Sequence, residues 1–310
     1  CRISSTRNYF VIPSTGNGTE GTNYNTTSFG YDQMGRRNQT TSPGGTITFT
    51  VFDERSLVSA VYVGTDATGA TETDPTGATE SDSTGPAESE SPGPPDTDST
   101  EGQAAGNNMV LVTQNEYDNG VAGRDGNLTS TWAWVDGSTS RQTEIAYDFR
   151  NRQTSVAGEE NAYSETTYDN LNRPLVRQTR NGSAAAVLLS KSQTDYDNRG
   201  RVYRTTNWAV NPTTGAIGLS LVSNTWYDAG GNVIKSLPAG SKLFSKTAYD
   251  ILGRATDQYV GYNLTAPTYA EAQTVVNDTI LEQQTMTYNQ IGTVLSTTAK
   301  QRYHDAVASQ

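Results

Sequence analysis

The sequence predicts an all-β protein, a solenoid-like succession of repeated β-hairpins. Three observations lead to this prediction. An aromatic-Asp dipeptide recurs with a base period of 21 or 22 residues, which is the mark of a repeat architecture. Turn-forming residues follow each copy at the same spacing. No segment places apolar residues at the three- and four-residue spacing of a helix.

The series begins after a lead-in at residues 1–28, and its first two repeats occupy residues 29–63. The steps between consecutive repeats are 21, 65, 30, 21, 28, 31, 22 and 39 residues, so longer steps are expected to be the same unit with a longer connection. The predicted repeat aromatics, which we expect to be largely buried and to occupy equivalent positions, are Tyr31, Phe52, Tyr117, Tyr147, Tyr168, Tyr196, Tyr227, Tyr249 and Tyr288.

The longest step contains an acidic, low-complexity segment at residues 64–106. It holds ten acidic residues and no Lys or Arg, and its 43 residues subtracted from the step of 65 leave 22, which restores the period. Such a composition does not bury enough apolar surface to offset its chain entropy. We therefore expect a solvated insertion that projects from the sheet. A weak Ca²⁺ site is the less favoured interpretation, because the EF-hand ligand pattern is missing.

The remaining repeats occupy residues 107–296, and each unit is expected to form a strand, a tight turn and a second strand. The Asp after the aromatic is expected to cap the turn by accepting backbone N–H bonds two or three residues on. The predicted capping residues are Asp32, Asp53, Asp118, Asp148, Asp169, Asp197, Asp228 and Asp250. Gly or Asn, which favour a left-handed turn conformation, follow the aromatic by four residues. These predicted turn residues are Gly35, Asn151, Asn172, Gly200, Gly231, Gly253 and Gly292.

Arg directly follows the turn residue in five copies, and its guanidinium is expected to pair with a neighbouring Asp or stack on the Tyr of the next unit. Two copies depart from the pattern. Ser56 holds the turn position after Phe52, so that turn is expected to differ. Val121 holds it after Tyr117, where a second turn signal follows at residues 123–128. A C-terminal segment at residues 297–310 completes the chain.

Composition and charge exclude several classes of protein. Val, Leu, Ile and Phe make up 51 of 310 residues, about 16%, a content typical of disorder, but 17 Tyr and 4 Trp add apolar surface. The net charge is −11, and without the insertion 23 acidic residues face 22 basic ones. A nucleic-acid partner bound through a basic field is therefore not expected. No apolar run approaches the roughly 18 residues of a membrane span.

Four hexapeptides carry a family resemblance. YDQMGR at 31–36, YDNLNR at 168–173, YDNRGR at 196–201 and YDILGR at 249–254 resemble the YD repeats of the Rhs family, which also occur in teneurins and in shell components of insecticidal toxin complexes. The resemblance extends over residues 29–296, apart from the insertion. It implies a sheet that spirals strand after strand, often closing into a hollow shell, and a secreted or cell-surface location. It implies no single activity, because function comes from what the repeats enclose or display.

The polar residues give no catalytic or metal-binding pattern. A catalytic site is not needed nine times, so the repeated Tyr-Asp pairs are expected to be structural. His304 is the only histidine and Cys1 the only cysteine, which leaves little support for a Ser-His-Asp or zinc site. We expect no catalytic residue, no metal and no cofactor. Surface carbohydrate remains an open partner, because Trp132, Trp134, Trp208 and Trp226 could stack on sugars, although interior packing is favoured for each.

The first expectation for function is a non-catalytic, extracellular scaffold that self-assembles into a fibre or surface structure. Its partners would be copies of itself or the rest of a longer parent chain, since open strand edges recruit further strands. The first alternative is a fragment of an Rhs-type shell that encloses and delivers a toxin. The third is a carbohydrate-binding adhesion module, and an enzyme is the least favoured option.

Overall fold

The computed structural model describes residues 2–72, 76, 107–121, 123–158, 162–263 and 268–303. It confirms the all-β prediction, because antiparallel strands provide nearly all of the regular structure. The described helices are η1, a 3₁₀ turn at Asp118–Gly120, and α1, a single turn at Tyr269–Ala272. Neither of these is long and apolar enough to span a membrane.

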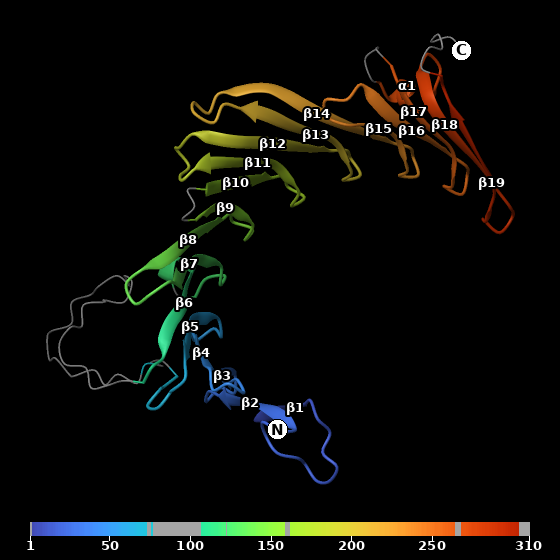
Figure 1. Cartoon of the computed structure of the whole chain (residues 1–310). Helices are drawn as coiled ribbons and strands as arrows, with labels where there is room; N and C mark the ends of the chain where they lie inside the picture. Colours follow the sequence, from blue (N-terminus) through green and yellow to red (C-terminus); the bar gives the residue numbers. More distant parts are fainter. Residues whose placement is uncertain are drawn as a thin grey trace. The chain divides into compact units, whose positions relative to one another are not determined.

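The chain divides into two compact units, Cys1–Ala162 and Tyr163–Gln310. In the first unit each strand pairs antiparallel with the next one along the chain, so the order in the sheet follows the sequence (Figure 1). Its strands are β1 (Ser5–Tyr9), β2 (Tyr24–Tyr31), β3 (Arg37–Thr41), β4 (Ile47–Phe52), β5 (Val58–Gly64), β6 (Val110–Tyr117), β7 (Leu128–Trp134), β8 (Ser140–Tyr147) and β9 (Gln153–Ala157).

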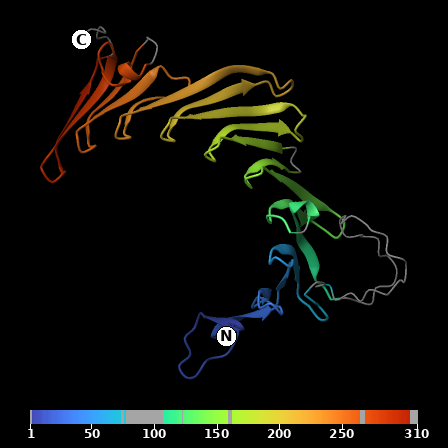
Figure 2. The same ribbon diagram turned by 180° about the vertical axis from the view of Figure 1, so that it is seen from behind.

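The second unit repeats this sequential pairing from β11 to β19, and Figure 2 shows the same succession from behind. Helix α1 lies in the connection between β17 and β18. The strands are β10 (Ala162–Tyr168), β11 (Pro174–Asn181), β12 (Leu188–Tyr196), β13 (Val202–Val210), β14 (Ile217–Tyr227), β15 (Val233–Leu237), β16 (Leu243–Tyr249), β17 (Ala255–Tyr262), β18 (Thr279–Tyr288) and β19 (Val294–Gln301).

Every even-numbered strand from β2 to β18 ends on one of the nine predicted repeat aromatics. A register shift lies directly before the aromatic wherever the pairing of that hairpin is described, as between Asp195 and Tyr196 at the end of β12. The same shift occurs before Tyr31, Phe52, Tyr117, Tyr147, Tyr227, Tyr249 and Tyr288. A bulge of this kind adds one residue to a strand and re-aims the side chains beside it. The repeat is therefore a hairpin with a bulge at its closed end.

The apolar core is small, as the composition implies. Ile47, Phe49 and Met109 form a buried cluster in the first unit, and Ala67 and Ala70 pack against it. The base of the predicted insertion therefore belongs to the folded structure, and Gly64 is the last residue of β5. Asn108 Oδ1 also accepts the backbone N–H of Thr65. Residues 73–75 and 77–106 of the insertion, together with Cys1 and His304, lie outside the described residues.

Candidate functional site at the hairpin turns

The turn between β12 and β13 shows what the repeated residues do. The N–H of Asp197 donates to the carbonyl of Arg201 and the N–H of Gly200 donates to the carbonyl of Asp197, both at 2.9 Å. The Asp197 carboxylate, through Oδ1, accepts the N–H groups of Arg199 and Arg201, also at 2.9 Å. Gly200 has a φ of 81°, a left-handed conformation that costs glycine little. One carboxylate and one glycine thus close the hairpin.

The other predicted turn residues follow this path. Each of the seven predicted Gly or Asn residues has a positive φ, between 59° and 99°. Ser56 also has a positive φ, of 68°, so the expectation that the turn after Phe52 differs was wrong. Its hydrogen bonds explain why: Asp53 Oδ1 accepts the N–H of Leu57 at 2.8 Å, as in the other turns. The capping carboxylate holds this turn even without Gly or Asn.

The second carboxylate oxygen of the capping Asp binds the arginine of the same turn. Arg201 Nε donates to Asp197 Oδ2 at 2.7 Å. The same ion pair joins Arg36 to Asp32, Arg152 to Asp148, Arg173 to Asp169 and Arg254 to Asp250. In the turn after Tyr227, Asn232 takes the place of the arginine and donates to Asp228 at 2.9 Å.

Four of the guanidinium groups, those of Arg36, Arg173, Arg201 and Arg254, also reach the following repeat. The Arg201 guanidinium lies 4.3 Å from the ring centre of Tyr227, and its Nη1 donates to the carbonyl of Asp228 at 3.3 Å. The ring in turn donates its hydroxyl to the carbonyl of Val202 at 2.8 Å. Arginine stacks at 4.6 Å in three further pairs, Arg36 over Phe52, Arg173 over Tyr196 and Arg254 over Tyr288. We call this repeated set of Asp, Arg and aromatic contacts the turn ladder.

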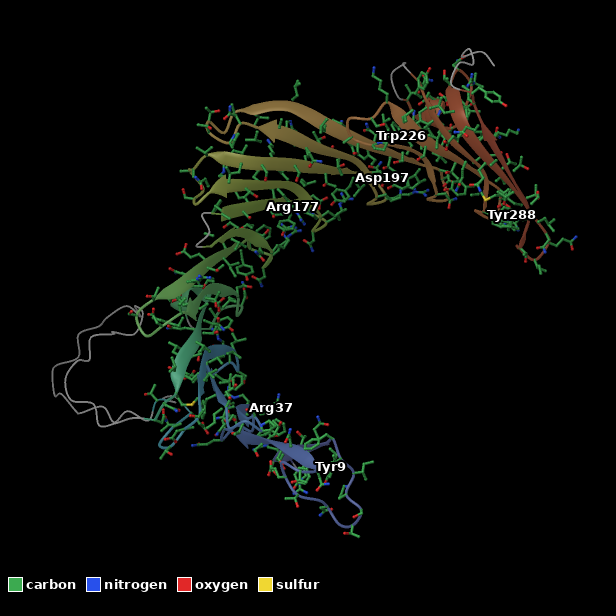
Figure 3. All side chains as sticks on the ribbon, in the orientation of Figure 1. Tyr9, Arg37, Arg177, Asp197, Trp226 and Tyr288 are labelled. Atoms are coloured by element: carbon green, nitrogen blue, oxygen red, sulfur yellow. The ribbon has the colours of Figure 1, made fainter. Side chains whose placement is uncertain are left out.

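The tyrosine hydroxyls form a regular series of hydrogen bonds within the turn ladder. Five of these hydroxyls donate to the carbonyl of the residue that begins the returning strand of the preceding hairpin. The pairs are Tyr117 with Val58, Tyr196 with Pro174, Tyr227 with Val202, Tyr249 with Val233 and Tyr288 with Ala255, at 2.7–3.1 Å. Figure 3 labels Asp197 and Tyr288 among these residues. The nine aromatics are all half-buried, which is less burial than expected for residues of a closed core.

The turn after Tyr117 is built differently. Asp118 is buried, and its carboxylate accepts the N–H groups of Gly126 and Asn127 at 2.9 Å, so the second turn signal closes the hairpin. Arg55 from the preceding turn pairs with Asp118 at 2.5 Å. Arg55 of the preceding repeat thus pairs with the capping Asp, as the arginine of the same turn does in other repeats.

Hydrogen bonding keeps the capping carboxylates ionised. The side chain of Arg152 lowers the pKa of Asp148 below its ordinary value. For Asp169, Asp197 and Asp250, backbone N–H groups from the following arginine are the largest cause of a lowered pKa. A carboxylate with a lowered pKa is a poor general acid or base near neutral pH, so this chemistry suits a structural role.

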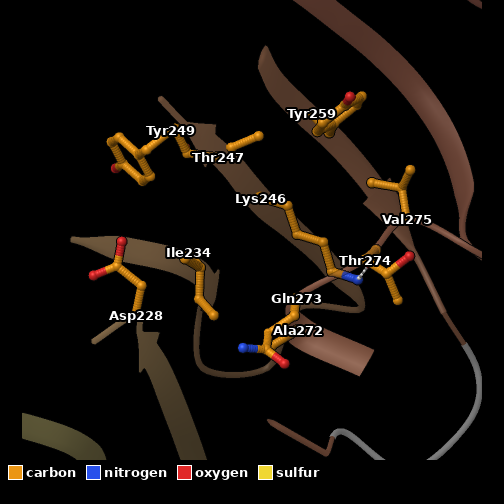
Figure 4. Close-up of a pocket in the computed structure, with 11 residues that line it drawn as sticks. Asp228, Ile234, Lys246, Thr247, Tyr249, Tyr259, Ala272, Gln273, Thr274 and Val275 are labelled. Atoms are coloured by element: carbon orange, nitrogen blue, oxygen red, sulfur yellow. Dashed lines mark hydrogen bonds between the residues drawn. The ribbon is translucent and has the colours of Figure 1, made fainter. Parts of the chain in front are cut away.

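Two buried lysines that the sequence analysis missed are Lys235 and Lys246, and Lys246 lines a cavity of about 480 Å³ in the second unit (Figure 4). Lys235 and Lys246 are each 3% exposed. Both donate to Glu271 of helix α1. The available sequence signal was the capping box Thr268-x-x-Glu271, in which the Thr268 hydroxyl accepts the N–H of Glu271 at 3.1 Å.

The tryptophans are half-buried, and two lie beside lysines. Lys191 Nζ is 5.0 Å from the ring centre of Trp208, and Lys235 Nζ is 5.1 Å from that of Trp226. Within the described ranges, no three His, Cys, Asp or Glu side chains come together as a metal site requires.

Comparison with known proteins gives little beyond this geometry. Neither a family model nor a curated protein matches the chain. Among solved structures, TcdB2-TccC3 without its hypervariable C-terminal region is 13% identical with a TM-score of 0.30, and a Photorhabdus luminescens Tc holotoxin pore is 10% identical with a TM-score of 0.27. These matches cover 89% and 90% of this chain but only 15% and 18% of theirs. Scores of this size give no basis for assigning a function.

Proposed function

We propose that this chain is a non-catalytic structural scaffold built of YD repeats, secreted or displayed at a cell surface. The turn ladder carries the proposal. Its carboxylates bind the turn backbone and the adjacent arginine, and those arginines stack on the next ring. The repeated polar groups thus form hydrogen bonds and ion pairs with one another. A stack in which each unit contacts its neighbours is stabilised as a sum of units and interfaces, as in other repeat proteins.

Strand pairing supports assembly with further strands. All residues of β1 and all residues of β19 are exposed. An exposed strand offers unpaired backbone groups along its outer edge, and pairing with another strand satisfies them at about 0.5–1.5 kcal/mol net for each hydrogen bond. The strand that binds there belongs either to another copy or to the rest of a longer parent chain.

A specific observation favours the shell form of this scaffold, in which the sheet encloses a toxin for delivery. Both faces of β12 and β13 are polar. Lys191, Gln193 and Asp195 point to one face, opposite Trp208, Thr206 and Arg204 of the neighbouring strand. The other face carries Ser192 and Thr194, opposite Asn207 and Thr205. A wall with water on both sides requires polar groups on both faces, whereas a sandwich sheet needs one apolar face.

Electron microscopy of the native particle distinguishes the forms. Closed ovoids support the enclosing shell, and long uniform filaments support the fibre. Sedimentation at micromolar concentration adds a second measurement. A stable monomer would contradict the fibre if both of its terminal strands exchange their amide hydrogens rapidly. The non-catalytic scaffold itself would be contradicted by a hydrolysis or group-transfer activity that is lost when a turn aspartate is substituted.

A further inference from the structure

Four charged side chains are buried together where the β17–β18 connection covers strands β15 and β16. Lys235 and Lys246 are each 3% exposed, the Asp278 side chain is 0% exposed and that of Glu271 is 13% exposed. Buried charges of this number are costly, and replacing such pairs by apolar residues is often neutral or stabilising. The turn ladder does not use any of them. Their arrangement therefore calls for a separate explanation.

Lys246 is the centre of the cluster. Its Nζ lies 2.5 Å from Asp278 Oδ2, 2.6 Å from Glu271 Oε1 and 2.7 Å from each of the backbone carbonyls of Glu271 and Thr274. An ammonium group has three N–H donors, and here four oxygens surround it. The amine and the Asp278 carboxyl are thus held in contact, in a site from which water is largely excluded.

Bond formation between them needs the neutral amine and the neutral carboxylic acid, which arise when Nζ of Lys246 passes one proton to Oδ2 of Asp278, the atom that it contacts. Lys235 is a second cation nearby, and both Nζ atoms lie 4.7 Å from the ring centre of Phe244. A neutral, desolvated lysine amine is a nucleophile.

The two carboxyl groups are placed for different roles. Asn263 Nδ2 donates to Asp278 Oδ1 at 2.8 Å, which polarises that carbonyl and stabilises negative charge that develops on it. Glu271 has no such amide donor, and its two oxygens contact one lysine each. Burial raises the pKa of Glu271, but the hydrogen bonds from Lys235 and Lys246 outweigh it, and the net pKa lies below the ordinary value. Lys246 loses its charge as the bond forms, so one of the interactions that lower this pKa weakens, and Glu271 Oε1, 2.6 Å from Nζ, is placed to receive a proton.

We propose that Lys246 and Asp278 join in an intramolecular isopeptide bond, with Glu271 as the proton relay. Nζ first gives one proton to Oδ2 of Asp278, and its lone pair then attacks Cγ, so that negative charge forms on Oδ1 beside the Asn263 amide. Glu271 takes a proton from Nζ and passes it to Oδ2. The Cγ–Oδ2 bond then breaks, and Oδ2 leaves as water.

The balance of this step is complete. The ammonium and the carboxylate together lose one water and become one neutral amide, so no oxidant, reductant or further reactant is needed. Glu271 returns to its ionised form and remains paired with Lys235, whose Nζ lies 2.5 Å from Oε2. The amide N–H keeps Glu271 Oε1 as its acceptor. The cluster thus changes from four buried charges to one ion pair and an amide, which lowers the cost of burial.

The wild-type chain provides the decisive measurement, intact mass spectrometry after full denaturation. We expect a mass lower by one water than the sequence predicts. A tryptic digest then locates the bond, because Lys242, Arg254 and Lys300 bound the two peptides concerned. Residues 243–254 should appear joined to residues 255–300, with no cleavage after Lys246. The full sequence mass, or a cross-link mapped to Glu271 or Lys235, overturns the proposal.

Variants separate the roles. Asp278→Ala and Glu271→Gln should retain the full sequence mass, whereas Asp278→Asn should reach the mass of the cross-linked wild type, because ammonia leaves in place of water. Lys242→Arg, at an exposed position before β16, is the matched control and should still lose one water. A Glu271→Gln chain that folds, as judged by circular dichroism, and still loses the water shows that Glu271 is not the relay.

Discussion

The two edges of each sheet are built by different rules. The connections that follow even-numbered strands form the turn edge, where eight of nine close within a few residues on an Asp, or on Asn289 in the last repeat. The connections that follow odd-numbered strands form the open edge, and they range from the short link of β7 to β8 to the acidic insertion between β5 and β6. The buried lysine cluster also belongs to an open-edge connection, between β17 and β18. Repetition therefore fixes one edge and leaves the other free to vary.

The largest expected effect lies on the open edge. Lys246→Met should destabilise the fold by about 3–5 kcal/mol, because it removes the link to Asp278 and leaves that carboxyl group buried without a cation in contact. Denaturation in urea measures the loss, and Lys242→Met is the exposed control. A loss no larger than the control's would show that this connection is only an accessory to the sheet.

Removal of an aromatic ring on the turn edge should destabilise the fold somewhat less than Lys246→Met. Tyr227→Ala is expected to cost about 2–3 kcal/mol, below the range of roughly 3–5 for a fully buried aromatic, because the ring is half-buried. Tyr227→Phe keeps the ring but loses the hydrogen bond to Val202, at about 0.5–1.5 kcal/mol. The control is Tyr203→Ala, an exposed ring on the adjacent strand. Equal losses in the free energy of unfolding for Tyr227→Ala and Tyr203→Ala would show that the turn ladder does not stabilise the fold.

The arginine of the same turn should contribute about 1 kcal/mol. Arg201→Gln removes the stack on Tyr227, and a cation–π contact at a half-exposed site is worth about 0.5–1 kcal/mol. Arg177→Gln on β11 has no such ring contact described and is exposed, so it should change the free energy of unfolding less. Urea denaturation of the two variants side by side tests this difference.

Acid should weaken the turn edge selectively. The pKa of Asp197 is lowered in the folded chain, so its contribution to stability is present above the pKa of the unfolded carboxyl, about 3.9, and is lost as pH falls through the lower folded value. The melting temperature of Asp197→Asn should therefore lie below that of wild type at pH 7 and approach it near pH 3. A constant difference across this range would mean that the ionised carboxylate is not what stabilises the turn.

The smallest effect is expected from the acidic insertion. Replacing residues 77–106 by a short Gly-Ser linker should stabilise the first unit by about 1 kcal/mol or less, since a shorter loop has a lower closure entropy. Deletion of 64–106 should be harmful instead, because it removes Ala67 and Ala70 from the buried cluster. Thermal melts of both variants compare the two boundaries. Equal stability of the two would place the insertion boundary at residue 64 after all.

The difference between the edges also decides what the sequence could predict. A turn is specified by residues within six positions of one another, so Asp197, Gly200 and Arg201 identify the hairpin without any structure. The lysine cluster joins residues 32 positions apart, through a connection that folds back over the sheet. Strand alternation gives no sign that Lys246 is covered. The bulge before each aromatic was missed for a related reason, because it depends on the pairing of two strands and not on either one.

The arginines of the turn ladder also give the sheet a direction. Arg36, Arg173, Arg201 and Arg254 each stack on a ring that comes later in the chain, while the tyrosine hydroxyls bind the hairpin before them. On the ribosome, therefore, each guanidinium leaves the exit tunnel before its ring. In these four repeats the new hairpin meets a finished neighbour that already presents a cation. The growing end of the sheet thus serves as the template for the hairpin that follows, and the protein can assemble at the pace of its own synthesis.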